Sequence, residues 1–151
     1  MTPVPQSRLR DVIFPIMAAA IKETRLSGRT TPEYTLTVLE AHYGSKEMAA
    51  YVDDLDNPTS CLICGVHRNP VIDELFASAY LVWVRADLRK SRKSLKLIDE
   101  MIVKLKEYGI MMNCHSATGS DWCYLGSSTG LRSVWEKHEF ELQERHFTII
   151  L

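Results

Sequence analysis

The sequence lacks the long apolar segments of a membrane protein or a secreted precursor. None of its 151 residues belongs to a run of the roughly 18 apolar residues that a membrane-spanning helix requires. The N-terminal segment MTPVPQSRLRD is too polar to form the apolar region of a signal peptide. We therefore expect a soluble, intracellular protein of the cytoplasm, with no membrane partner.

An excess of charge is also absent. The formal net charge is −1, whereas domains that bind nucleic acid usually carry a clear basic excess. No internal repeat, low-complexity tract or linker divides the chain, and its length suits one domain with its own core. We expect a single domain over residues 1–151 and no nucleic-acid partner.

Cysteine is scarce, and only one pair has a close spacing. Cys61 and Cys64 form a CxxCG motif, which is one half of a typical zinc site. The other candidate zinc ligands are Cys114, His115 and Cys123. A second CxxC motif is missing, and the two residues between Cys61 and Cys64 are aliphatic, as in a buried strand. The pattern therefore favours reduced thiols without a metal.

The first part of the chain has the apolar spacing of helices. A helix is predicted over residues 8–25, and Pro15 is expected to kink or delay it because proline removes a helix hydrogen bond. Thr31 before Pro32 is typical of a helix N-terminus, and this second helix is expected to end near Gly44.

The rest of the chain alternates between strand and helix patterns. A third short helix is predicted over 45–52, followed by an antiparallel hairpin whose strands are the apolar runs 60–67 and 75–84. A helix ending at Gly109 and a strand over 110–114 then complete a crossover between parallel strands. The last expected elements are a short helix over 129–138 and a strand over 140–151.

A basic loop follows the second hairpin strand and precedes the helix that ends at Gly109. Its basic residues are Arg85, Arg89, Lys90, Arg92 and Lys93. A strand that leads through such a loop into a helix is typical of phosphate binding, because the first helical turn offers unpaired N–H groups and partial positive charge. The loop has no glycine, which phosphate-binding loops generally use, so a solvated positive loop is the alternative interpretation.

Two motifs and the order of elements resemble the GCN5-related N-acetyltransferases. In that family a long strand leads into a loop of the form Arg/Gln-x-x-Gly-x-Gly/Ala, which holds the pyrophosphate of acetyl-coenzyme A together with the next helix. VRADLRKSRKSLKLI is similar, with Val84 ending the strand and Arg89 at the first motif position. SSTGLRSVWEKHEF resembles a second family segment, N-x-x-A-x-x-L-Y-x-K-x-G-F, with Lys137 and Phe140 in register.

The resemblance implies an α/β fold with N-terminal helices and a mixed, mostly antiparallel sheet. It implies acetyl-coenzyme A as the cofactor and an amine or a protein as the acceptor. The cofactor contacts that it implies are Trp83, Val84, Arg89, Lys90, Ser91, Arg92, Lys93, Ser94 and Ser128. The N-terminal helices resemble those of small acetyltransferase-like proteins of bacteriophages, which would place the chain in a host cytoplasm or a virion.

The sequence departs from the family pattern at positions that matter for activity. Arg92 occupies the first glycine position of the loop, and Trp135 occupies that of a tyrosine that protonates the departing thiolate in many relatives. Acetyl transfer to an amine needs a base and an acid. The candidates are Glu74 as the base, His115 as its alternative, and Tyr124 in place of the missing tyrosine.

Two functions therefore remain open. The chain is either an acetyl-coenzyme A-dependent N-acetyltransferase or a catalytically inactive protein of the same fold, with a structural or interaction role as a homodimer or in a bacteriophage particle. The basic loop favours the enzyme, whereas the missing glycines and tyrosine favour the inactive protein.

Overall fold

The computed structural model describes residues 1–23, 30–69, 71, 73–89, 91–119, 134 and 136–139. Its described strands form a five-stranded sheet in the order β1-β2-β3-β4-β5. Only β4 and β5 are parallel, and the other neighbours are antiparallel. The strands are β1 (Thr2–Pro3), β2 (Met48–Val52), β3 (Ser60–Asn69), β4 (Glu74–Val84) and β5 (Ser116–Thr118). The expected α/β fold, the β3–β4 hairpin and the parallel crossover are confirmed.

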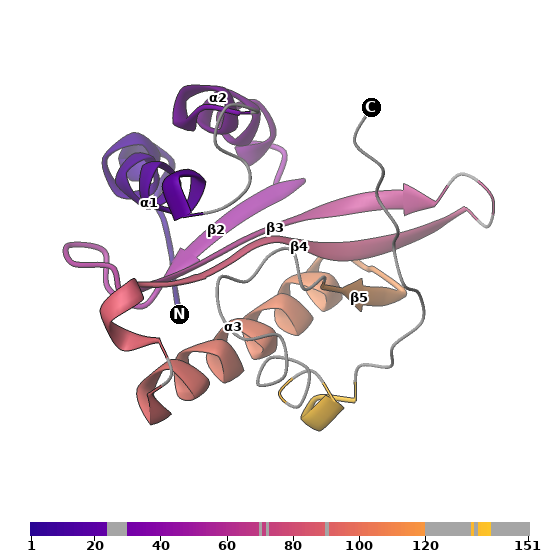
Figure 1. Cartoon of the computed structure of the whole chain (residues 1–151). Coiled ribbons are helices and arrows are strands. Elements are labelled where there is room, and N and C mark those ends of the chain that lie inside the picture. Colours follow the sequence, from indigo (N-terminus) through magenta and orange to yellow (C-terminus); the bar gives the residue numbers. More distant parts are fainter. Residues whose placement is uncertain are drawn as a thin grey trace, which may run out of the picture.

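The helices cover the sheet on both sides. The α-helices are α1 (Leu9–Glu23), α2 (Pro32–Tyr43) and α3 (Arg92–Met111), and the short 3₁₀ turns are η1 (Gln6–Arg8) and η2 (Ala86–Leu88). Helices α1 and α2 lie on one face of the sheet, and α3 lies on the other (Figure 1). Among the described residues, no helix has the length and apolar character needed to cross a lipid bilayer.

Both N-terminal helices agree with the sequence pattern. The Thr31 hydroxyl caps α2 by accepting a hydrogen bond from the Tyr34 N–H at 3.2 Å, and Pro32 is the first helical residue. Helix α1 begins at Leu9 and includes Pro15, so the helix does not start later, one of the two effects expected of this proline. Its buried apolar stripe holds the helix against the sheet in spite of the missing hydrogen bond.

The prediction of a helix over residues 45–52 is wrong, because this segment contains strand β2. Methionine and alanine favour helices in isolation, but all of Met48–Val52 pairs with β3. Its last residues, from Ala50 to Val52, are buried in the sheet. Burial between two layers of helices therefore outweighs the local helix preference.

The end of α3 also differs from the prediction. Gly109 does not stop the helix, which continues to Met111, and the next strand is β5 instead of 110–114. A Cβ atom at Gly109 would lie 3.3 Å from the Cβ of Ala77 in β4. The glycine thus allows α3 to approach β4 closely, and a helix stop is not its role.

The short helix expected over 129–138 is described only in part. Val134 is buried, and the His138 N–H donates to its carbonyl at 3.3 Å, as in a helical turn. Asp99 of α3 accepts hydrogen bonds from the side chains of Lys137 and His138, each at 2.8 Å. These bonds join the segment to α3. The strand expected over 140–151 lies outside the described residues.

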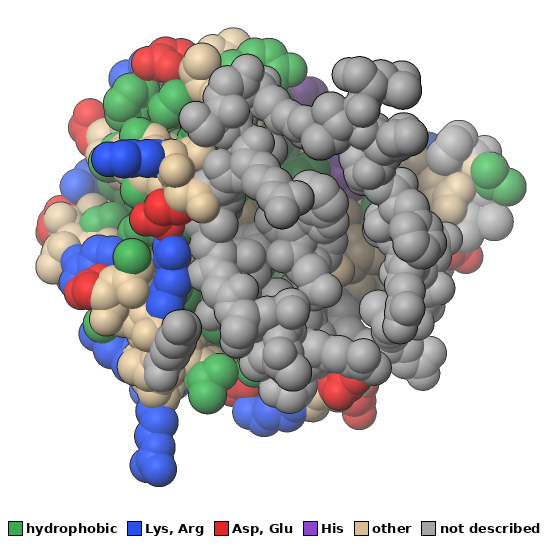
Figure 2. Space-filling view, in the orientation of Figure 1, with side chains coloured by type: hydrophobic (Ala, Val, Ile, Leu, Met, Phe, Trp, Pro, Cys, Tyr) green, Lys and Arg blue, Asp and Glu red, His purple; other side chains and the backbone are tan. Residues whose placement is uncertain are grey.

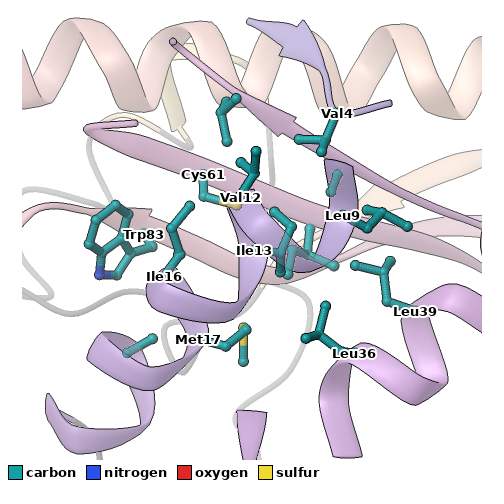
Figure 3. Packing of buried hydrophobic residues seen from close by; sticks show 14 of the residues in the cluster. Val4, Leu9, Val12, Ile13, Ile16, Met17, Leu36, Leu39, Cys61 and Trp83 are labelled. Atoms are coloured by element: carbon teal, nitrogen blue, oxygen red, sulfur yellow. The ribbon is translucent and has the colours of Figure 1, made fainter. Parts of the chain in front are cut away.

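The core has two layers, one on each face of the sheet. The layer under α3 includes Leu62, Cys64, Val82, Ile98, Met101 and Leu105. The layer under α1 and α2 includes Leu9, Ile13, Leu36, Leu39, Cys61 and Trp83 (Figure 3). Because both faces are covered, β3 is buried continuously from Ser60 to Gly65, and it becomes exposed only toward the hairpin.

A carboxylate holds the loop that connects β2 to β3. Asp53 accepts hydrogen bonds from the backbone N–H groups of Thr59 and Ser60, each at 2.8 Å, and from the Thr59 hydroxyl. Burial on its own raises the pKa of Asp53, but these hydrogen bonds outweigh it and leave the pKa below its usual range. The Thr59 carbonyl in turn accepts from the Arg85 N–H at 2.9 Å, so this loop fixes the end of β4.

We expect Asp53→Ala to lower the free energy of unfolding by about 1–3 kcal/mol, because two backbone donors lose their acceptor. Urea denaturation at neutral pH measures the loss. A carboxyl group whose pKa is lowered by folding stabilises the protein above its unfolded pKa, and this contribution disappears as the pH falls through the folded pKa. The difference between wild type and variant should therefore shrink in acid.

Asp56→Ala is the matched control, since Asp56 is an exposed carboxylate of the same loop whose one ion pair within the described residues is with Arg8. Its effect should stay within about 0.5 kcal/mol. Equal losses for both variants would show that Asp53 has no special role.

Candidate functional site

The end of β4 and the start of α3 are joined by a tightly bonded loop. The Ser91 hydroxyl caps α3 by accepting from the Ser94 N–H at 3.1 Å, and it donates to the Leu88 carbonyl at 2.5 Å. The buried Ser94 hydroxyl donates to the Ser91 carbonyl at 2.8 Å. Both serines of the expected phosphate loop therefore shape the helix N-terminus itself.

The first turn of α3 is open and positive. No hydrogen bond among the described residues uses the backbone N–H groups of Arg92 and Lys93. Both side chains are exposed, neither forms an ion pair within the described part of the chain, and no acidic residue occupies this turn. Basic side chains are visible on this side of the molecule (Figure 2). A helix of this length with unpaired N–H groups at its start attracts anions.

Arg85, in contrast, is bound to neighbouring side chains. Its guanidinium forms two hydrogen bonds with the Asp87 carboxylate, at 2.8 and 3.1 Å, and a third with the Asn57 side chain at 3.3 Å. The hydrogen bond from Arg85 lowers the pKa of Asp87. Arg85 therefore connects η2 to the β2–β3 loop.

Arg89 is also bound within the protein. Its Nε donates to the Val84 carbonyl at 2.8 Å, and its Nη2 forms an ion pair with Glu23 at the end of α1. Only 17% of the Arg89 side chain is exposed. The residue at the first motif position thus ties the loop to β4 and α1. Lys90, the remaining basic residue, lies outside the described residues.

Trp83 and Val84 contribute their side chains to the core. Trp83 lies beside Ile16 of α1, and the buried Nε1–H of its indole has no hydrogen-bond acceptor among the described residues (Figure 3). Val84 lies in the layer under α3. If these two residues contact a ligand, they do so through the backbone.

Next to the loop, the edge of β4 toward β5 pairs with no strand of the described residues. Strand β5 pairs only with Phe76, Ala77 and Ser78. From Tyr80 to Trp83, no described strand pairs with this edge of β4. Within the described part of the chain, this stretch of backbone has the extended form that could pair with an extended ligand running from the helix N-terminus along β4.

A bulge in β4 lies next to this open edge. Ile63 pairs with Leu81 and Cys64 pairs with Ala79, so Tyr80 is an extra residue without a partner in β3. Bulges occur often beside active sites, because they redirect a side chain. The sequence carries a signal for it that the prediction missed. The small or branched residues on the α3 face are Ala77, Ala79, Val82 and Val84. They stand at odd positions before Tyr80 and at even positions after it, so the alternation of the strand shifts by one residue there.

The bulge brings Tyr80 to His67 of β3. The two side chains form a hydrogen bond of 2.5 Å between the Tyr80 hydroxyl and His67 Nε2. The imidazole also stacks on Phe76, with ring centroids 5.3 Å apart and an angle of 24°. His67 is exposed and Tyr80 is 41% exposed, while partial burial raises the pKa of the phenol. Three aromatic rings thus form a fixed cluster at the surface.

Gly65 makes room for this cluster. A Cβ atom there would lie 2.6 Å from Cε2 of Tyr80 and 2.9 Å from the backbone oxygen of Glu47. The adjacent hydroxyl groups of Ser78 and Thr118 form a hydrogen bond of 2.8 Å across β4 and β5. Polar and aromatic groups from three strands therefore meet where the parallel pairing ends.

Two of the predicted catalytic residues, Glu74 and His115, lie at the other end of β4. Glu74 pairs with Asn69 beside the hairpin turn, and the His115 N–H donates to the Leu75 carbonyl at 2.8 Å. The structure thus brings Glu74 and His115 to the same end of the sheet. At about 3.3 Å per residue, Glu74 is roughly 33 Å along β4 from Val84. Tyr124 and Ser128 lie outside the described residues.

The cysteines provide no metal site in the described part of the chain. Cys61, Cys64 and Cys114 are free thiols, as predicted, and Cys61 and Cys64 belong to opposite core layers. Burial raises the pKa of both Cys61 and Cys64. No described group of three or more His, Cys, Asp or Glu side chains is arranged to hold a metal ion.

Solved structures share this fold over nearly the whole chain. One of them, described as a probable acetyltransferase, has a TM-score of 0.70 and 14% identity, with 100% of this chain and 98% of that protein covered. A protein of Clostridium acetobutylicum described as a predicted acetyltransferase, solved with acetyl-coenzyme A, has a TM-score of 0.69 and 9% identity, with 98% of this chain and 93% of that protein covered. A Trypanosoma brucei acetyltransferase has a TM-score of 0.65 and 14% identity, with 99% and 96% covered.

These likenesses show that the chain has the fold of the GCN5-related N-acetyltransferases. No protein-family model and no curated protein matches the sequence. Because one fold supports many activities, the function depends on the residues of the site.

We expect the ion pair of Arg89 and Glu23 to stabilise the fold. In a double-mutant cycle with Arg89→Met and Glu23→Gln, urea denaturation should give a coupling energy of about 1 kcal/mol, because both groups are largely shielded from water. The exposed pair of Arg10 and Glu40, 3.5 Å apart, is the matched control and should couple by a few tenths of a kcal/mol, as is typical of surface pairs. A coupling near zero for Arg89 would leave its guanidinium free to bind a ligand.

Proposed function

We propose that this chain binds acetyl-coenzyme A at the β4–α3 junction and transfers its acetyl group to an amine. The observation that carries the proposal is the N-terminus of α3, where two exposed basic residues follow a strand whose edge toward β5 pairs with no described strand from Tyr80 to Trp83. The shared fold supports it, since one of the neighbours was solved with acetyl-coenzyme A.

The residues present fit the acetyl donor. The N–H groups of Arg92 and Lys93 are suited to the oxygen atoms of its pyrophosphate, and the buried Ser94 keeps the helix start compact. The exposed guanidinium of Arg92 supplies charge-assisted hydrogen bonds where the family has glycine. The open edge of β4 offers backbone groups to the amide-containing arm. When bound, acetyl-coenzyme A supplies an activated acetyl group as a thioester.

Calorimetric titration of the full chain with acetyl-coenzyme A tests this proposal. Arg92→Gln and Lys93→Gln together should weaken binding about tenfold or more, because each removes a cation next to phosphate. The loss should diminish as salt is added. Arg10→Gln removes an exposed charge at the distant end of α1 and should leave the affinity unchanged.

The outcomes separate the competing functions. Undetectable binding to wild type would refute the proposal. Binding without acetylation of any amine in a broad panel would instead leave a non-enzymatic protein of this fold. The expected bacteriophage origin is supported by none of the structures compared above.

A further inference from the structure

Tyr80, His67 and Phe76 form a cluster on the described surface that belongs neither to the buried core nor to the basic loop. Two of its side chains, those of Tyr80 and His67, can donate or accept a proton. Its geometry is fixed from three directions: the bulge turns Tyr80 toward β3, Gly65 admits the ring, and Phe76 stacks on the imidazole. The cluster has a defined hydrogen bond and yet remains open to solvent. An ordered but exposed polar pair is suited to act on a bound molecule.

The position of Tyr80 along β4 matches the length of the acetyl donor. The pantetheine arm of coenzyme A has about as many chain atoms as four amino-acid residues, which span at most roughly 14 Å. Tyr80 precedes Val84 by four residues, or roughly 13 Å of strand. An arm that starts at the end of β4 and follows its open edge therefore ends near Tyr80. Glu74, roughly 33 Å from Val84, is beyond this reach.

We propose that Tyr80 is a catalytic residue of the acetyl transfer and that His67 is the positioning residue and proton acceptor behind it. The inference rests on the proposed function, because it places the thioester of acetyl-coenzyme A at the Tyr80 hydroxyl. It assigns proton transfer to two residues of the β3–β4 hairpin, in place of Glu74 and Tyr124, the residues that the sequence suggested.

The hydrogen bond provides a path for a proton between Tyr80 and His67. When the Tyr80 hydroxyl donates to His67 Nε2, that nitrogen is unprotonated and the imidazole is neutral. A neutral amine attacks the acetyl carbon, a C–N bond forms, and the C–S bond breaks with its electron pair on sulfur. The amine proton passes to the Tyr80 oxygen as the phenolic proton moves to Nε2. The same pair then returns one proton to the thiolate, so the protein ends unchanged.

Proximity is tested first, by nuclear magnetic resonance on the complex with acetyl-coenzyme A. We expect nuclear Overhauser contacts between the acetyl methyl group and the Tyr80 ring protons, assigned by their loss in Tyr80→Leu. We also expect a shift of the His67 imidazole nitrogens on binding, which Tyr80→Phe abolishes. Calorimetric binding without any of these contacts would overturn the assignment and leave the proposed function intact. Undetectable binding would overturn both.

Turnover is tested by thiol release from acetyl-coenzyme A with a panel of primary amines. Tyr80→Phe keeps the ring and removes the hydroxyl, so kcat should fall about 100-fold or more, the range of general acid–base catalysis, while the calorimetric Kd stays within twofold. His67→Ala should lower kcat similarly, whereas His67→Gln, which retains an acceptor, should recover part of it.

The exposed Tyr34 of α2 provides the matched control, and Tyr34→Phe should behave as wild type. Wild-type turnover in Tyr80→Phe, or a strong loss in Glu74→Gln with none in Tyr80→Phe, would overturn the assignment. If wild type releases no thiol with any amine, both the acetyl transfer and the catalytic role of Tyr80 are overturned, whereas the binding of acetyl-coenzyme A is judged separately by calorimetry.

Discussion

The ladder between β3 and β4 is the interaction on which the rest of the structure depends. It joins ten residue pairs and lies at the centre of the sheet, with β2 on one side and β5 on the other. Both core layers are built on it, because α1 and α2 cover one face and α3 covers the other. Its length exceeds that of the covered region, so the part of β3 beyond Gly65 carries side chains that are free to face solvent.

One irregularity in this ladder couples the core to the candidate site. Ala77 and Ala79 face α3, and after the extra residue Tyr80, Val82 and Val84 face α3 again. Without the bulge, one of these two pairs would lie on the opposite face, since strand side chains alternate. Packing on both faces therefore requires an extra residue near this point. The same residue lies two positions beyond Ser78, where the described pairing of β4 with β5 ends, so the bulge that the core requires coincides with the end of that pairing.

The sequence predicted those features that depend on local rules. The Thr31 cap, the hairpin and the crossover follow from capping and apolar spacing, and the structure confirms them. The helix prediction for residues 45–52 was wrong because helix preference is a local property, whereas the burial of this segment depends on pairing with β3, which is distant in the chain. Gly109 was misinterpreted because a glycine at a helix end and a glycine at a close contact look alike without the neighbouring Ala77. The cluster around Tyr80 was missed for the same reason, since it joins residues of two strands.

The basic loop shows that a basic residue in the sequence does not always supply a free positive charge at a binding site. Arg85 and Arg89 resemble phosphate ligands in the pattern, but Asp87 and Glu23 neutralise them and use them to hold the loop. Among the described basic residues of this region, Arg92 and Lys93, on the helix itself, keep exposed cations beside N–H groups that bond to no described residue. The ion pairs restrict the loop and so fix where the helix begins. Side-chain hydrogen bonds and ion pairs thus order this loop although it has no glycine. The groups suited to bind an anion are therefore those of the first turn of α3, and not the backbone of the loop.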